Sequence, residues 1–189
     1  MKKTLTVLLA LVLVIAMSVA GTMAYLTSTA TVTNTFTVGK VAITLDESKV
    51  DVYGKDDPTA DGRVTRNEYR LIPGQTYKKD PIVHFQPNSE ASWLFVKLEN
   101  GIASYQDNPT IERQITDNGW EELTGVTGVY YKQVNANFTT AAIDYPVFQN
   151  FTIRDTAAPA GTPTVTVTAY AIQRAGIDTA ADAWAKVGT

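Results

Sequence analysis

Six threonines occupy every second position from Thr27 to Thr37. The alternate positions carry mostly small or apolar side chains: Leu26, Ser28, Ala30, Val32, Asn34, Phe36 and Val38. Successive side chains of a β-strand point to opposite faces, so a period of two in β-branched residues is typical of a strand with one buried and one wet face. Fully extended, residues 27–38 span roughly 40 Å, whereas a common strand spans about 17–20 Å. We therefore expect a mainly β fold that begins with an unusually long strand.

The pattern of apolar residues predicts further strands and two short helices. After Gly39, Val41, Ile43 and Leu45 continue the alternation on the opposite parity, which indicates a bulge or kink. Residues 46–68 are polar and predict a long loop or irregular hairpin. Further strands are expected at residues 69–72, 82–85, 93–98, 128–133, 147–153 and 162–173, with turns at Pro73–Gly74 and Asn100–Gly101.

One helix is expected from Ile111 to Asn118 with a glycine stop, and one over residues 178–187, where Thr179 and Asp182 can form a capping box. Many short strands without strand–helix alternation predict an antiparallel two-sheet sandwich with jelly-roll-like topology. We expect residues 25–189 to form this single β-sandwich domain, with residues 25–38 as a possible donor strand.

The N-terminal 24 residues have the features of a cleavable signal peptide. Lys2 and Lys3 precede an apolar run from Leu5 to Ala20, and small residues follow before a cut between Ala24 and Tyr25. The run of about 16 residues is shorter than the roughly 20 that span a bilayer as a helix, although a retained N-terminal anchor is the alternative. We expect a secreted protein, extracellular or at the cell surface, that touches the membrane only through the uncleaved leader.

Composition and charge exclude several classes of chemistry. The chain has no cysteine, which removes disulfides, thiolate catalysis and cysteine-ligated metals, and in an exported protein suggests a Gram-positive envelope. The net charge of −3 becomes about −5 without the two leader lysines, and there is no basic run. Nucleic acid and anionic lipid are therefore not expected as partners.

Catalytic motifs are also missing from the sequence. A zinc hydrolase needs three protein ligands and an open position, but the only histidine, His84, has no HExxH spacing and sits in a predicted strand. No GxSxG motif is present. We expect no enzymatic activity and no catalytic residues; a site with one histidine and two carboxylates is the alternative.

The polar loop contains a spacing similar to that of an EF-hand calcium loop. Gly62 stands at the sharp turn, Val64 at the apolar position, and six residues fall at liganding positions: Asp57, Thr59, Asp61, Arg63 through its carbonyl, Thr65 and Glu68. Thr59 in place of an acid, Pro58 inside the loop and the lack of a preceding helix depart from the motif. Calcium is the one cofactor hypothesis; a solvated Asp–Gly turn is the alternative.

Several motifs along the chain resemble one family. The N-terminal motifs are Gly21-Thr22-Met23-Ala24-Tyr25-Leu26-Thr27, Asn34-Thr35-Phe36-Thr37-Val38-Gly39-Lys40-Val41 and Ile43-Thr44-Leu45-Asp46-Glu47. Later motifs are Asn67-Glu68-Tyr69, Leu71-Ile72-Pro73-Gly74, Lys79-Asp80-Pro81, Tyr170-Ala171-Ile172-Gln173 and Ala183-Trp184. With these motifs the chain resembles the TasA/camelysin family of exported Firmicutes proteins, which are processed by a SipW-type signal peptidase. The resemblance implies a jelly-roll domain at the cell surface whose subunits join by passing an N-terminal strand into a neighbour.

These observations predict a secreted structural protein, such as a biofilm-matrix or cell-surface fibre subunit. A long strand freed by cleavage can add to an exposed sheet edge of another copy, with pockets for Val32, Phe36 and Val38 setting the register and Asn34 on the same face. Addition of this kind is head-to-tail and yields oligomers or filaments. Three alternatives stay open: the strand pairs within its own domain, the protein is a camelysin-like metalloprotease, or it is a monomeric adhesin that binds through residues 46–68.

Overall fold

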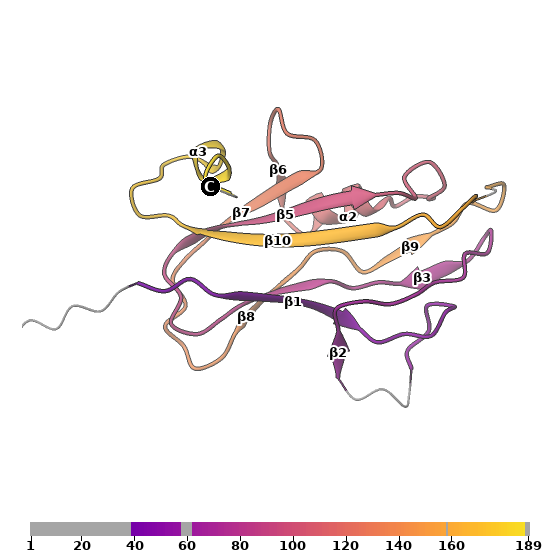
Figure 1. Cartoon of the computed structure of the whole chain (residues 1–189), viewed down its shortest axis with the longest axis horizontal. Coiled ribbons are helices and arrows are strands. Elements are labelled where there is room, and N and C mark those ends of the chain that lie inside the picture. The colour runs from indigo at the N-terminus through magenta and orange to yellow at the C-terminus, as the bar shows by residue number, and fades with distance from the viewer. Residues whose placement is uncertain (1–38, 58–61, 158, 188–189) are drawn as a thin grey trace, which may run out of the picture. The chain divides into compact units, whose positions relative to one another are not determined.

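The described residues form two four-stranded sheets and a two-stranded sheet, and every strand pair among them is antiparallel (Figure 1). The computed structural model describes residues 39–57, 62–157 and 159–187. The first sheet has the order β2-β1-β4-β8 and consists of β1 (Ile43–Ser48), β2 (Arg63–Val64), β4 (Ile82–Phe85) and β8 (Ile143–Pro146).

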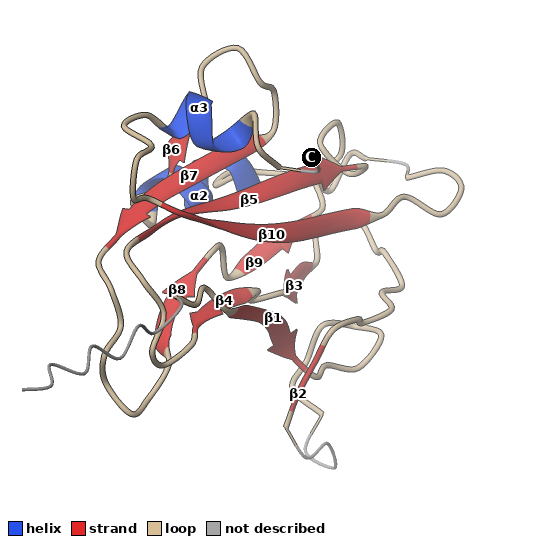
Figure 2. Ribbon diagram, turned by 60° about the vertical axis from the view of Figure 1, so that its left-hand side comes forward, coloured by secondary structure: helices blue, strands red, loops and turns tan. Residues whose placement is uncertain are grey.

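The second sheet has the order β10-β5-β7-β6 and consists of β5 (Ser92–Asn100), β6 (Glu121–Glu122), β7 (Val129–Val134) and β10 (Val165–Gln173). A short pair joins β3 (Thr76–Lys78) to β9 (Asn150–Thr152). The predicted mainly β, antiparallel two-sheet sandwich is confirmed (Figure 2). Its jelly-roll connectivity stays a prediction.

The main hydrophobic core lies between the two large sheets. Val83 and Phe85 of β4 meet Leu94 and Val96 of β5 there, and all four side chains are fully buried. From β10, the predicted inward face of Val165, Val167, Ala169 and Ala171 packs on the same core. The face of β10 that the alternation predicted to be buried is therefore the one that faces the core.

A second core covers the outer face of the β10-β5-β7 sheet. Trp93 and Phe95 of β5 pack there with helix α3 (Ala180–Trp184), whose Trp184 ring lies 5.2 Å from that of Phe95. Because both faces of β5 are covered, its sequence is almost continuously apolar rather than alternating. The predicted cap of α3 is present: the Thr179 hydroxyl accepts a hydrogen bond from the Asp182 amide.

Helix α2 (Ile111–Asp117) follows the prediction in position and in its glycine stop, and it also has an N-cap at Thr110 that was not predicted. The Thr110 hydroxyl accepts a hydrogen bond from the Arg113 amide, and Gly119 beyond the C-cap has a φ of 76°. Ile111 and Ile115 are the buried residues of the helix, as the i, i+4 spacing predicted.

The prediction of a strand at residues 69–72 is wrong. Pro73–Gly74 does form the predicted turn, but the strand follows it as β3. The amide of Arg70 donates to the Val52 carbonyl and that of Ile72 to the Tyr77 hydroxyl, so this segment is held by loop contacts. Of the strand expected at residues 147–153, only the three residues of β9 are in a strand. The short strands β6 and β8 were not predicted.

Candidate functional site

The outer edge of β10 has no neighbouring strand among the described residues. At its two ends, the Gly101 amide donates to the Thr164 carbonyl and the Arg174 amide donates to the Ala91 carbonyl, both at 2.8 Å. Even-numbered residues of β10 therefore direct their backbone groups to β5. The alternate residues, Val165, Val167, Ala169 and Ala171, direct their N–H and C=O groups to the open edge.

Within the described ranges, strand β1 has a second edge that is largely without a partner strand, beside that of β10. The Gln86 amide donates to the Ala42 carbonyl, which sets the β1–β4 register and turns the backbone of Ile43 and Leu45 away from β4. On that side β2 pairs only with Glu47 and Ser48. β1 and β10 lie side by side (Figure 1), so two edges that have no full partner strand among the described residues face one flank of the sandwich.

A cleft of about 1030 Å³ opens on this flank between the two sheets. Its apolar lining comes from both sheets and the β3–β9 layer: Leu45, Tyr69, Leu71, Ile102, Phe151, Val165 and Val167. Glu47, Asn67 and Lys79 supply polar groups to the same cleft. The cleft is therefore large enough for several apolar side chains and carries a polar patch on one wall.

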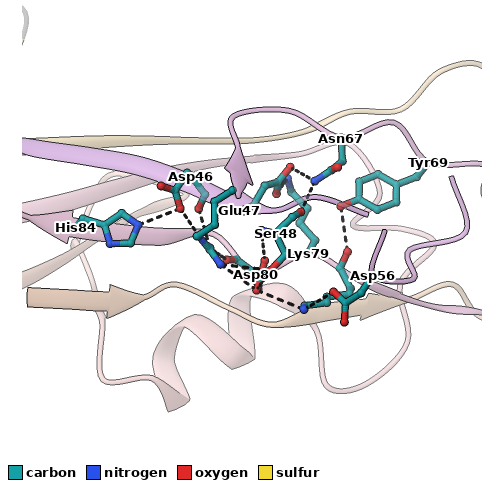
Figure 3. Close-up of polar contacts among 11 residues, drawn as sticks. Asp46, Glu47, Ser48, Asp56, Asn67, Tyr69, Lys79, Asp80 and His84 are labelled. Carbon is teal, nitrogen blue, oxygen red and sulfur yellow. Dashed lines mark hydrogen bonds and ion pairs between the residues drawn. The ribbon is translucent and has the colours of Figure 1, made fainter. Parts of the chain in front are cut away.

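The polar wall is built on a buried ion pair. The Lys79 ammonium lies 2.6 Å from the Glu47 carboxylate, and the Asn67 amide donates to the same carboxylate at 3.0 Å (Figure 3). Asn67 also donates to the Ser48 carbonyl and accepts from the Val50 amide. Beside them, burial and then the charges of Glu47 and Asp80 raise the pKa of Tyr69 far above its ordinary value, so its hydroxyl stays a neutral donor to the Lys78 carbonyl.

On the outer face of the first sheet, His84 links three strands. Its Nδ1 lies 2.5 Å from the Asp144 carboxylate of β8, and its Nε2 lies 3.0 Å from the Asp46 carboxylate of β1. Partial burial alone would lower the pKa of His84, but the hydrogen bonds and charges of the two carboxylates outweigh it and raise that pKa. The protonated imidazolium therefore ties β1, β4 and β8 together.

Arg63 continues this network into β2. Its guanidinium pairs with Asp46 and, at 3.5 Å, with Asp80. Asp80 also accepts hydrogen bonds from the amide and hydroxyl of Ser48, both at 2.7 Å. Burial acts to raise the pKa of Asp80, yet these bonds and the Arg63 charge hold it below its ordinary value. The charged groups of this face are mutually paired.

No group of three or more histidine, aspartate or glutamate side chains in the described part of the chain is placed to hold a metal ion. His84 lies on strand β4, as expected, with both ring nitrogens directed at carboxylates. The expected lack of enzymatic activity and the metalloprotease alternative stay predictions.

Four of the six calcium-loop residues are described. Arg63 lies in β2, Thr65 is exposed, and the Glu68 carboxylate is 3.1 Å from Arg66. Asp57 borders the segment 58–61, which lies outside the described residues together with Thr59 and Asp61. The calcium hypothesis therefore stays a prediction.

The predicted assembly strand and its cleavage point lie outside the described residues: Ala24, Tyr25, Val32, Asn34, Phe36 and Val38. None of the helices in the described ranges is both long and apolar enough to cross a membrane. No family model, curated protein or solved structure matches the chain. As far as the structure describes the chain, its fold and site define an antiparallel β-sandwich with two free strand edges beside a cleft between the sheets.

Sequence reasoning missed the ion pairs because their members are far apart in the chain. Asp144 is 60 residues from His84, and Glu47 is 32 residues from Lys79. One signal was present: Thr44, Asp46 and His84 occupy the polar positions of two alternating strands, so antiparallel pairing would bring them to one face.

Proposed function

We propose that this protein is a secreted structural subunit that assembles by strand addition. In this proposal, residues 25–38 of one copy pair with the outer edge of β10 of the next copy. The free backbone groups of β10 from Val165 to Ala171 are the observation that carries the proposal. An exposed strand that has a neighbour on one side only is a template for β-augmentation, in which another chain adds a strand and backbone hydrogen bonds supply the affinity.

The side-chain pattern of β10 matches that of the proposed donor strand. Thr166 and Thr168 are exposed on one face of β10, while Val165, Val167 and Ala169 face the core between the sheets. Residues 31–38 have the same alternation, with threonines on one face and Val32, Phe36 and Val38 on the other. An added strand in this register places threonine beside threonine outside and apolar side chains over the cleft.

Cleavage between Ala24 and Tyr25 by a SipW-type signal peptidase would free this strand at the membrane. Until then, the strand is joined to the apolar leader and has a restricted reach. The resemblance to the TasA/camelysin family supports both the export route and a role at the cell surface or in a biofilm matrix. Self-association is the partner interaction proposed, with no nucleic acid involved.

A single proline tests the proposed edge. The Ala169 N–H points away from β5, so Ala169→Pro removes a donor from the free edge without removing a bond of the β5–β10 ladder. Ala169→Ser keeps the N–H and serves as the matched control. The mature chain, residues 25–189, and its Ala169→Ser variant should form filaments in electron microscopy and light scattering, whereas Ala169→Pro should stay monomeric with an unchanged thermal midpoint.

A second comparison tests the donor. A chain that starts at Lys40 retains both hydrophobic cores and should remain monomeric. Equal assembly of this chain and of the mature chain contradicts the proposal. Cleavage of casein by the mature chain that a chelator abolishes would favour the metalloprotease instead.

A further inference from the structure

The described residues carry five exposed large apolar side chains: Val52, Tyr53, Ile72, Phe138 and Ile143. They divide into two groups at opposite ends of β1. We call Phe138 and Ile143 the head patch, and Val52, Tyr53 and Ile72 the tail patch. Isolated apolar residues on a surface are ordinary, whereas exposed apolar side chains that gather on one surface mark interaction sites.

The head patch lies near the start of β1, close to the first described residues. Ile143 of β8 lies opposite Phe85 of β4, and Phe85 in turn lies opposite Ile43, the first residue of β1. The Asn137 amide donates to the Ser89 carbonyl, and the Ser89 hydroxyl lies 3.2 Å from the Ala42 amide. The 71% exposed Phe138 therefore follows a residue that is hydrogen-bonded through Ser89 to Ala42, three residues after Gly39, where the described chain begins.

The turn that presents Phe138 is held rigidly. The Asn137 side chain is fully buried, and its amide donates to the carbonyls of Phe85 and Ala141 at 3.0 and 2.9 Å. Its carbonyl oxygen accepts from the amide and hydroxyl of Thr139. An exposed aromatic ring on an anchored turn loses little conformational entropy when it binds, which is a property of interface anchors.

The tail patch lies beyond the other end of β1, beside β3: the Lys78 amide donates to the carbonyl of Gly54, the residue after Tyr53, and the Ile72 amide donates to the Tyr77 hydroxyl. The Arg70 amide donates to the Val52 carbonyl, and the Gln75 side chain donates to the Tyr53 carbonyl. The Gln75 amide donates to the Ile72 carbonyl, so residues 70–75 hold the three tail residues together.

The proposed strand addition brings these two ends together. All strand pairs that the structure describes are antiparallel, and an antiparallel donor would run from the Gln173 end of β10 towards Val165. In the donating copy, Gly39 lies next to Gln173: a Cβ added to Gly39 would lie 3.4 Å from the Gln173 side-chain nitrogen. The head end of the donating copy thus meets the tail end of the receiving copy, as in a head-to-tail filament.

We infer that the head patch of each subunit packs on the tail patch of the subunit that receives its N-terminal strand, so that the filament has an apolar contact in addition to the shared sheet. This inference rests on the proposed strand addition. It assigns Phe138 as the anchor of the contact and Tyr53 as the main residue of the opposing surface.

The critical concentration for assembly of the mature chain measures this contact. Phe138→Ser and Tyr53→Ser should each raise it about tenfold, a change that corresponds to about 1.4 kcal/mol. Phe138→Tyr keeps the ring and should stay near the wild type. Since the two residues would act in one contact, the double variant Phe138→Ser/Tyr53→Ser should be little worse than either single variant.

The fold and the strand addition have separate readouts. Thermal unfolding of the monomeric Phe138→Ser variant should match the wild type, because the ring is mostly exposed. Filaments of Phe138→Ser at an unchanged critical concentration overturn the inference and leave strand addition intact, as does strict additivity of the two serine variants. A wild-type mature chain that forms no filaments overturns both.

Discussion

The Lys79 ammonium and the Glu47 carboxylate form an ion pair of 2.6 Å whose side chains are only 11% and 5% exposed. Removing two charges from water is costly, and their attraction offsets that cost only while both partners are present. Loss of one partner leaves a buried, uncompensated charge beside the cleft. Breaking the pair should therefore lower the free energy of unfolding by more than the intact pair contributes to it.

Lys79→Met should lower the free energy of unfolding by about 3 kcal/mol, because the Glu47 carboxylate then stays buried with only Asn67 as a side-chain donor. The double variant Glu47→Gln/Lys79→Met removes the stranded charge and keeps an acceptor for Asn67, so it should recover much of that loss. Urea denaturation of the three proteins measures both effects. A single variant no less stable than the double variant contradicts this account.

The network around His84 predicts a pH dependence of stability. The pKa of His84 is raised in the folded protein, whereas an unfolded histidine titrates near 6.5. The imidazolium contribution is therefore complete below about pH 6.5 and is lost as the pH rises through the folded pKa. His84→Gln should remove this decline in the free energy of unfolding between neutral and mildly alkaline pH.

At acid pH the carboxylates make stability change with pH in the opposite direction. Burial acts to raise the pKa of Asp46, but its bonds to His84 and Arg63 hold that pKa below the ordinary 3.8, as also occurs for Asp80. Their contribution is present above about pH 4 and is lost as the pH falls through the lowered values. Asp46→Asn should flatten this acid limb, as followed by thermal unfolding between pH 2 and 5.

Asn137→Ala should destabilise the protein by about 2–3 kcal/mol, because the carbonyls of Phe85 and Ala141 lose a buried donor. Asn135→Ala, two residues earlier at an exposed position, serves as a control and should be near neutral. Urea denaturation separates the two variants. Equal stability would show that the turn under Phe138 does not depend on the Asn137 amide.

Periodicity predicted those elements whose side chains alternate against a core. Residues 82–85 are β4 with the predicted bounds, because Val83 and Phe85 face inward between half-buried neighbours. It failed at Tyr69, whose ring packs edge-on against Tyr77 and Phe151 although its backbone is not in a strand. A partly buried aromatic residue in a loop and one in a strand have the same sequence signal. β8 was missed because an edge strand with a proline and exposed residues lacks that alternation.

The free edges were not predictable from the sequence. Whether β10 has a second neighbour depends on how strands distant in the chain are arranged, and the alternation of Val165, Val167, Ala169 and Ala171 is the same in either case. The ion pairs depend on register in the same way, since Thr44 must lie opposite His84 for Asp46 to reach it. The sequence does predict the complementary donor, because residues 27–38 alternate more strictly than any other segment.

The calcium hypothesis has a direct test in the mature chain. Strand β2 pairs with β1 through Val64 opposite Glu47, which leaves the Arg63 carbonyl on the side away from β1, while the Arg63 guanidinium binds Asp46 and Asp80. The carbonyl that the EF-like spacing needs is therefore not used in the β1 ladder.

Isothermal titration with calcium should give heat at millimolar ion, and the double variant Asp61→Asn/Glu68→Gln should give none. Asp56→Asn changes a neighbouring carboxylate that pairs with Lys78 and lies outside the six liganding positions, so it should titrate like the wild type. No heat from the wild-type chain at that concentration eliminates the calcium site and leaves the loop as a solvated turn that enters β2.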